Sequence, residues 1–218
     1  MSGLSSSPRL IRAGLVLMEP DTGAVSRIIA LQYAPETLTR EVKAQAIADG
    51  QNRSQALRLT GPASETISLD AVIDATDQLE FPDRNPDAAR LGIFPALAAL
   101  ETLLYPTSAQ LERQKAQGAA GSFEITPAET PLALFVWSAQ RIVPVRLDSL
   151  QITEEFFDPN LNPIRAKLSL SMKVLSVDDL GFGHRGAGLF MAYLQAKEQL
   201  AAKAQAGTLD ALGAGGLR

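Results

Sequence analysis

The most regular hydrophobic pattern of the chain lies in its third quarter. From Ile164 to Val174, apolar and polar residues alternate with an unbroken period of two. This period predicts a strand with one buried face and one face in water. The preceding segment Ile142–Phe157 alternates in the same way, with a slip before Leu150, and the turn-forming segment Asp158–Pro163 separates the two. We therefore expect a long antiparallel hairpin.

Other segments also carry strand signals. Leu132–Ser138 is a nearly continuous apolar run, typical of a strand that is covered on both faces. In Glu65–Thr76 the alternation slips near Ala71, which indicates a β-bulge at that residue. Two apolar segments near the N-terminus flank a Glu-Pro-Asp-Thr-Gly turn and predict a hairpin. The remaining expected strands are Leu10–Met18, Ala24–Tyr33 and Ala56–Pro62.

Helical spacing of apolar residues predicts two helices. The first covers Asp87–Leu104, within which Pro95 should either kink the helix or mark its first turn. The second covers Leu189–Gln205, which is rich in good helix formers. Ala109–Gln117 has room for a helical turn or two. For Thr39–Ala48 the composition does not decide between a helix and a strand.

These elements predict a fold that is mainly β with helices, of the α+β class. We expect a disordered N-terminal tail over residues 1–9 and one β-rich domain over residues 10–176. Within that domain, Phe81–Pro86 reads as a polar loop and residues 107–131 as a flexible insertion. Residues 177–218 are expected to form a glycine hinge, the last helix and a mobile tail.

Composition narrows the classes of function. The 218 residues are 46% hydrophobic and 20% charged, with a net charge of −4, no cysteine and a single histidine. The missing cysteine excludes disulfide frameworks and thiol catalysis, and one histidine argues against His-based metal sites and catalytic triads. The acidic balance argues against a nucleic-acid partner. No apolar run suggests a membrane span or a signal peptide, so we expect cytoplasmic assembly.

The single histidine, His184, lies among four glycines in GFGHRGAG. A functional interpretation is an anion-binding loop or a catalytic imidazole ahead of the last helix. However, the spacing matches no phosphate-binding motif. A hinge before the helix is the favoured interpretation.

Two groups of acidic residues in the sequence could form a metal site or an acid/base pair. Asp70, Asp74, Asp77 and Glu80 supply oxygen ligands, but their spacing lacks the pattern of an EF-hand loop, so a solvated strand end is favoured over a metal site.

The second acidic group is the Glu154-Glu155 pair beside Phe156-Phe157, at the approach to the hairpin turn. It could act as an acid/base pair, but an exposed acidic tip with an aromatic anchor fits an interaction surface better. Trp137, the only tryptophan, is expected to pack in the core. We therefore expect no catalytic, cofactor-binding or metal-binding residues.

The ordered set of motifs resembles a known family, the tube-protein N-terminal domain of contractile injection systems, which are phage-tail-like particles. The resemblance covers roughly residues 10–176, and Ala34 stands where the family tends to have asparagine. The matching segments are Ile29–Val42, Leu57–Glu80, Gly92–Pro106 and Leu132–Leu175.

The resemblance implies an antiparallel β-barrel or sandwich of the tail-tube type, with one long helix and a C-terminal helical arm. It also implies a non-enzymatic baseplate subunit that forms a ring, hexameric in the family, between the inner tube and the spike, hub and wedge proteins. In related proteins a LysM module can follow, and residues 177–218 show none. Such a subunit would be assembled in the cytoplasm without direct membrane insertion.

Two alternatives from other classes stay open. The chain could be an anion-binding or small-molecule-binding enzyme that uses His184 and its glycine loop. It could also be a stand-alone carbohydrate-binding β-sandwich, although aromatic residues make up only 6% of the chain.

Overall fold

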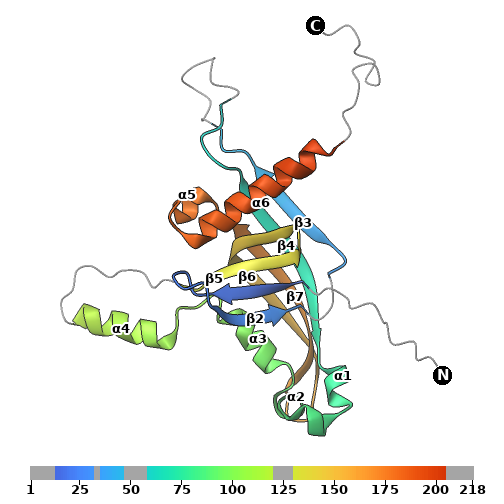
Figure 1. The fold of residues 1–218 in the computed structure, drawn as a ribbon. Coiled ribbons are helices and arrows are strands. Elements are labelled where there is room, and N and C mark those ends of the chain that lie inside the picture. The colour runs from blue at the N-terminus through green and yellow to red at the C-terminus, as the bar shows by residue number, and fades with distance from the viewer. Residues whose placement is uncertain (1–12, 32–34, 47–57, 120–129, 205–218) are drawn as a thin grey trace.

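Seven antiparallel strands form a single sheet in the computed structural model, which describes residues 13–31, 35–46, 58–119 and 130–204 (Figure 1). The α+β class expected from the sequence is confirmed. The strands are β1 (Gly14–Met18), β2 (Val25–Ala30), β3 (Leu38–Lys43), β4 (Ser64–Asp74), β5 (Leu132–Ser138), β6 (Arg141–Phe157) and β7 (Pro163–Val174).

The strands pair in the order β2-β1-β5-β6-β7-β4-β3, so the sheet has two edges, β2 and β3. Both predicted hairpins are confirmed, because β1 pairs with β2 and β6 pairs with β7. The slip in the alternation of β6 is also real, since the register of this pair shifts between Leu147 and Ser149. Among the described residues, β2 and β3 do not pair with each other, so the sheet remains open.

The structure resolves one ambiguous prediction about a strand and corrects another. The ambiguous segment Thr39–Ala48 begins as strand β3, which pairs with β4 at the edge of the sheet. The predicted bulge near Ala71 is wrong, because the pairing of β4 with β7 runs without a shift from Thr66 to Asp74. Val72 interrupts the apolar alternation because it lies on the otherwise polar face of the strand, not because the backbone slips.

The predicted helix Asp87–Leu104 is two helices. Gly92 separates them with a φ of +57°, and the next residue, Ile93, donates its backbone N–H to the carbonyl of Pro163 at 2.9 Å. Pro95 lies in the first turn of the second helix, as one of the two predictions for it required. The two helices are α2 (Pro86–Leu91) and α3 (Phe94–Glu101).

Other helices begin or end away from the predicted residues. Helix α6 (Arg185–Ala202) starts four residues before the predicted Leu189, and α4 (Ser108–Ala119) extends the one or two turns expected there. The loop Phe81–Pro86 contains a short 3-10 helix. Two further short helices carried no periodic signal in the sequence, namely α1 (Thr76–Leu79) and α5 (Val177–Leu180).

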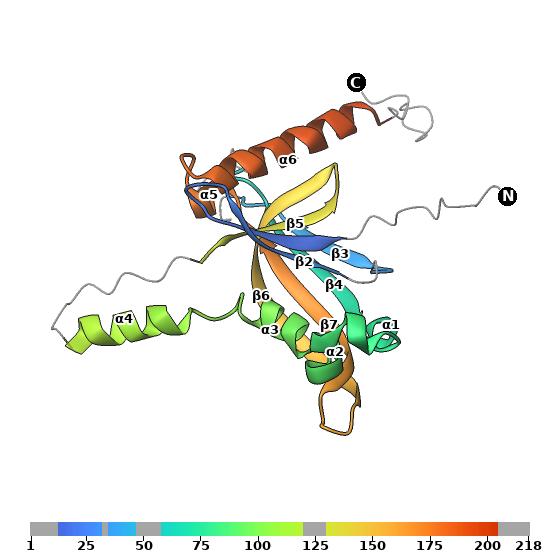
Figure 2. The same ribbon diagram turned by 60° about the horizontal axis from the view of Figure 1, so that its bottom comes forward.

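The core lies on one face of the sheet. Phe135 of β5 is fully buried at its centre, and Trp137 is half-buried with its ring centroid 6.0 Å from that of Phe135. Leu97 and Leu100 of α3 pack into the same cluster, as do Phe190 and Tyr193 of α6. In both views α6 and α3 lie against the sheet, whereas α4 extends away from it (Figures 1 and 2).

Several predictions concern residues that the structure does not describe. The tail over residues 1–9 and the end of the chain from residue 205 are beyond the described residues, as are residues 120–129 of the expected insertion. The division of the chain at residues 176 and 177 stays a prediction. No helix of the described residues is long and apolar enough to cross a membrane.

The junction between α2 and α3 gives a first prediction. A Cβ at Gly92 would lie 2.2 Å from the Pro163 carbonyl oxygen, and φ there is +57°. Gly92→Ala should therefore lower the free energy of unfolding by at least about 1–3 kcal/mol, the cost of a strained backbone, measured by denaturant titration.

The matched control is Gly188→Ala within α6, where the added methyl group meets no atom within 4 Å. This change should raise the free energy of unfolding by about 0.5–1 kcal/mol, the ordinary gain of alanine over glycine in a helix. Equal effects of the two substitutions would contradict the assigned role of Gly92.

Candidate functional site

A continuous polar face spans four neighbouring strands, β3, β4, β7 and β6. The strand register brings polar residues that are far apart in the chain into the same transverse rows. In the central rows Thr39 pairs with Ser68, and Asp70 pairs with Ser169. The other members of the face are Glu41, Thr66, Val72, Asp74, Arg146, Ser149, Gln151, Thr153, Glu155, Arg165, Lys167, Ser171 and Lys173.

The middle of this polar face is rich in small hydroxyl side chains. Two hollows of about 800 Å³ and 250 Å³ lie over it. Both hollows are lined by Asp70, Gln151 and Ser169, and the carboxylate of Asp70 accepts a hydrogen bond from the Ser169 hydroxyl. The surface therefore presents mainly hydrogen-bonding groups to water, with Val72 as the apolar member of the face.

Charges on the polar face neutralise one another. Near the hairpin turn, Lys167 Nζ lies 2.6 Å from Glu155 Oε1, and Arg165 Nε lies 3.7 Å from Glu155 Oε2. Asp74 Oδ2 is 4.0 Å from Arg165 Nε, and hydrogen bonds from Thr76 hold the pKa of Asp74 below its usual value although desolvation opposes them. Neither sign of charge dominates, so the face offers no strong field to a charged ligand.

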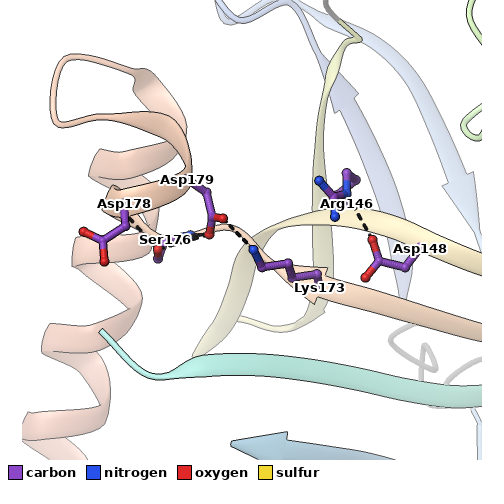
Figure 3. Close-up of polar contacts among 6 residues, drawn as sticks. All are labelled: Arg146, Asp148, Lys173, Ser176, Asp178 and Asp179. Carbon is purple, nitrogen blue, oxygen red and sulfur yellow. Dashed lines mark hydrogen bonds and ion pairs between the residues drawn. The ribbon is translucent and has the colours of Figure 1, made fainter. Parts of the chain in front are cut away.

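The far end of the polar face is anchored where β7 runs into α5 (Figure 3). Arg146 Nε donates to Asp148 at 3.0 Å, and Lys173 donates to Asp179. Asp179 also accepts from the backbone N–H of Ser176 at 2.9 Å and closes a capping box at the start of α5. Desolvation raises the pKa of Asp179, but the hydrogen bonds from Lys173 and Ser176 outweigh it and leave the pKa lowered.

The acidic residues considered from the sequence do not converge on one site. Asp70 and Asp74 lie on β4, whereas Asp77 lies in α1 and Glu80 follows it. No group of three or more His, Asp or Glu side chains that could hold a metal ion occurs in the described part of the chain.

Glu154 and Glu155 do not form an acid/base pair. Consecutive residues of a strand point to opposite faces of the sheet. Glu155 lies in ion pairs on the polar face, next to Arg165 and Lys167.

His184 caps a helix. Its Nδ1 accepts a hydrogen bond from the backbone N–H of Gly186 at 3.0 Å, which satisfies a free donor of the first turn of α6. The side chain also lines a cleft of about 620 Å³ that has Leu17, Leu132 and Leu147 among its lining residues. This hydrogen bond explains structurally why histidine precedes the helix, while the absence of catalytic residues stays a prediction.

A buried ionic cluster, which the sequence pattern did not predict, fastens α6 to the sheet. Glu65 on β4 is only 3% exposed, and its carboxylate accepts hydrogen bonds from three side chains. Its Oε1 lies 2.8 Å from Arg40 Nε of β3 and 2.9 Å from the Tyr193 hydroxyl of α6. Its Oε2 lies 2.7 Å from Lys197 Nζ. We refer to Glu65, Arg40, Tyr193 and Lys197 as the Glu65 clasp.

The Glu65 clasp keeps the carboxyl group charged. Desolvation by burial raises the pKa of Glu65, but the hydrogen bonds from Lys197, Arg40 and Tyr193 outweigh it, so the net pKa is lowered. The Lys197 ammonium also lies 4.1 Å from the centroid of the Tyr193 ring, a cation–π contact. A signal for Glu65 exists in the sequence, because it shares the period-two phase of buried Ile67, Leu69 and Ala71.

Comparisons with known proteins add two structural likenesses. No family model matches the chain, and no curated protein does. A solved chain described as the tail of an empty GTA particle with C6 symmetry aligns with a TM-score of 0.31 and 14% identity, over 75% of this chain and 90% of that chain. A chain from the virion of a native gene transfer agent particle aligns with a TM-score of 0.27 and 10% identity, over 74% and 90%. Likenesses at these levels do not establish a common fold.

The Glu65 clasp predicts a pH-dependent contribution to stability. Because the folded-state pKa is lowered, the carboxylate stabilises the fold above its ordinary pKa of about 4.3 and loses this effect as pH falls through the folded-state value. Glu65→Gln should lower the free energy of unfolding by about 1–3 kcal/mol at neutral pH, the range for a buried group that loses its charged partner.

The measurement is denaturant unfolding of both proteins from pH 7 downward. The difference between them should begin to shrink once the pH falls below about 4, where the unfolded-state carboxyl binds a proton that the folded-state carboxyl does not yet bind, and it should vanish below the folded-state pKa. The control is Glu154→Gln at an exposed position of β6, which should change little at either pH. A difference for Glu65 that persists in acid would contradict the electrostatic origin.

Proposed function

We propose that this chain is a non-enzymatic structural subunit of a phage-tail-like particle of the contractile injection type. Support comes from the ordered motifs that resemble the tube-protein family, together with a sheet that has two open edges and one polar face. The observation that carries the proposal is the strand order, because β2 and β3 each have one side that pairs with no strand of the described residues.

The edge strands fit assembly into a ring. Val25 and Ile28 of β2 and Val42 of β3 are exposed apolar residues on strands whose outer backbone groups face no strand of the described chain. Unprotected edges of this kind normally carry a risk of aggregation. If β2 of one subunit pairs with β3 of the next, the contact is heterologous and can close into a ring, hexameric by family resemblance. Edge pairing is then the function of these strands.

The polar face fits the lumen of such a ring. A channel that transports cargo should not retain it, and the face defined above is rich in hydroxyl groups and balanced in charge. The opposite face cannot take this role, because its Leu168, Leu170 and Met172 are buried beneath helices in the core. The orientation of the subunit follows from this difference between the faces.

The position in the particle is the finer part of the proposal. We place the ring at the junction of the inner tube and the baseplate, where it links the tube to spike, hub and wedge proteins, as the family resemblance implies. The subunit would assemble in the cytoplasm and then become part of the particle. Nucleic acid is not a partner, in keeping with the net charge of −4.

Ring formation is tested at the edge strands. The double substitution Val25→Lys and Ile28→Lys should abolish rings without unfolding the subunit, because edge lysines oppose strand pairing. The measurement is negative-stain microscopy with size-exclusion chromatography, where the assembled peak should shift to the monomer. Leu111→Lys in α4 is the matched control, since that side chain is also exposed but lies away from both edges. Rings that persist in the double variant would overturn the edge contact.

The lumen assignment is tested with single cysteines, which the chain otherwise lacks. Thr153→Cys on the polar face and Leu200→Cys on α6 are each labelled with biotin maleimide in the unassembled subunit. After assembly, streptavidin should capture rings labelled at position 200 but not rings labelled at position 153, because a folded protein cannot enter the lumen. Equal capture of both would place the polar face on the outside.

A further inference from the structure

The turn of the β6–β7 hairpin carries an exposed apolar tip. Phe156, Phe157 and Leu161 are 66%, 50% and 75% exposed. Large apolar side chains gathered at one protruding point mark an interaction site more often than chance exposure does. In Figure 2 this turn extends beyond α2, at the end of the molecule away from α6. We refer to these three residues as the tip.

The tip is held rigidly. The Asp158 carboxylate accepts hydrogen bonds from the backbone N–H of Asn160 at 2.7 Å, from the backbone N–H of Asn162 at 2.8 Å and from the Asn162 side chain at 2.8 Å. Phe156 and Leu161 have φ values of +55° and +63°, which non-glycine residues rarely adopt. Such strain persists where the surrounding structure enforces it, and it concentrates at binding sites.

The same chain carries a cleft that matches the tip in character. The 620 Å³ cleft has Leu17, Leu132 and Leu147 among its lining residues, with exposed Tyr105 at its rim. Its volume falls within the range of about 300–1,000 Å³ that encloses compact apolar ligands. The combined volume of the Phe156, Phe157 and Leu161 side chains is of this order.

Charge also matches between the tip and the cleft. Glu154 and Asp158 flank the tip. Arg27 and Arg146 line the cleft against one acid, Glu19. Arg146 is ion-paired with Asp148, so Arg27 is the cation of the lining that would meet the acidic flank of the tip. Complementary charges of this kind orient a contact and speed its formation.

A chain cannot place its tip in its own cleft. Leu147 and Phe157 lie on the same strand, and ten residues of β-strand span about 33 Å. The hairpin is paired along this length, so it cannot fold back. The tip of a second copy of the chain matches the cleft in size and in charge, so we take a second copy as the occupant.

We infer that the tip of one subunit inserts into the cleft of the next subunit, in a head-to-tail contact along the strand direction. The contact is heterologous, so it can repeat from copy to copy along the strand direction. It goes beyond the proposed ring contact, because it joins the tip to the cleft and needs no pairing between edge strands, although Arg27 of β2 lines the cleft. In a particle it would join successive rings.

Cysteine crosslinking tests the contact. The double variant Leu161→Cys with Tyr105→Cys should form a ladder of disulfide-linked chains under mild oxidation, seen on a non-reducing gel. A disulfide needs Cα atoms within about 7 Å, which the two positions reach only between copies in the inferred contact. The control pairs Leu161→Cys with Leu200→Cys on α6, which is exposed and lies outside the cleft lining. No ladder, or an equal ladder in the control, would overturn the inference.

A second variant tests whether the tip acts through contact with another subunit and not through the stability of the fold. Phe156→Gly with Leu161→Gly removes two apolar side chains at positions where glycine relieves the backbone strain. The variant should fold as well as the original and still form rings, but its head-to-tail association should weaken by at least about tenfold, as for loss of a contact hot spot. Stacked assemblies that remain intact would overturn the inference and leave the ring proposal standing.

Sedimentation with vesicles of phosphatidylcholine and phosphatidylglycerol decides between a protein and a lipid partner. The original chain should not bind these vesicles. Binding that the double glycine variant loses would assign the tip to a membrane and overturn the inference. Loss of rings in the edge-strand variant, with crosslinking unchanged, would confirm that the two contacts are independent.

Discussion

The register of β7 between its two neighbours is the constraint on which the rest of the structure depends. Side chains of a strand alternate between the faces of the sheet, so one register assigns every residue to the core or to water. Leu168, Leu170 and Met172 face the core, while Ser169 and Ser171 between them face the hollows over the polar face. A shift of one residue would bury the serines and expose the leucines. The hydrophobic core and the candidate surface are therefore two results of one pairing.

The sequence predicts the fold where such local periodicity decides the outcome. The strict alternation of β7 and the slip in β6 predicted the hairpin and its irregular register, and both are confirmed. Prediction failed where a contact distant in the chain decides. The break between α2 and α3 depends on Gly92 meeting the carbonyl of Pro163, and nothing near residue 92 reveals that neighbour. The bulge expected at Ala71 was wrong because an apolar residue on the polar face mimics a slip.

The candidate surface is harder to predict than the strands that carry it. Ser68, Ser149 and Ser169 are ordinary surface residues in the sequence, and only the sheet order brings them to one face. The Glu65 clasp could be predicted from the sequence only in part. The phase of Glu65 marks it as buried, but its partners Arg40 and Lys197 are 25 and 132 residues away along the chain. Burial of a charge is readable from a pattern, whereas the identity of its partners requires the packed structure.

The two proposed contacts act along different directions of the sheet. Edge strands pair along the hydrogen-bond direction, which in an antiparallel sheet is perpendicular to the strands. The tip and the cleft are instead separated along the strand axis, by the length of the β6–β7 hairpin. A subunit can therefore join its neighbours sideways through β2 and β3 and still have its hairpin free to reach the next layer. This perpendicular arrangement is what a ring needs in order to grow into a stack. The two contacts meet at β2, whose Arg27 also lines the cleft.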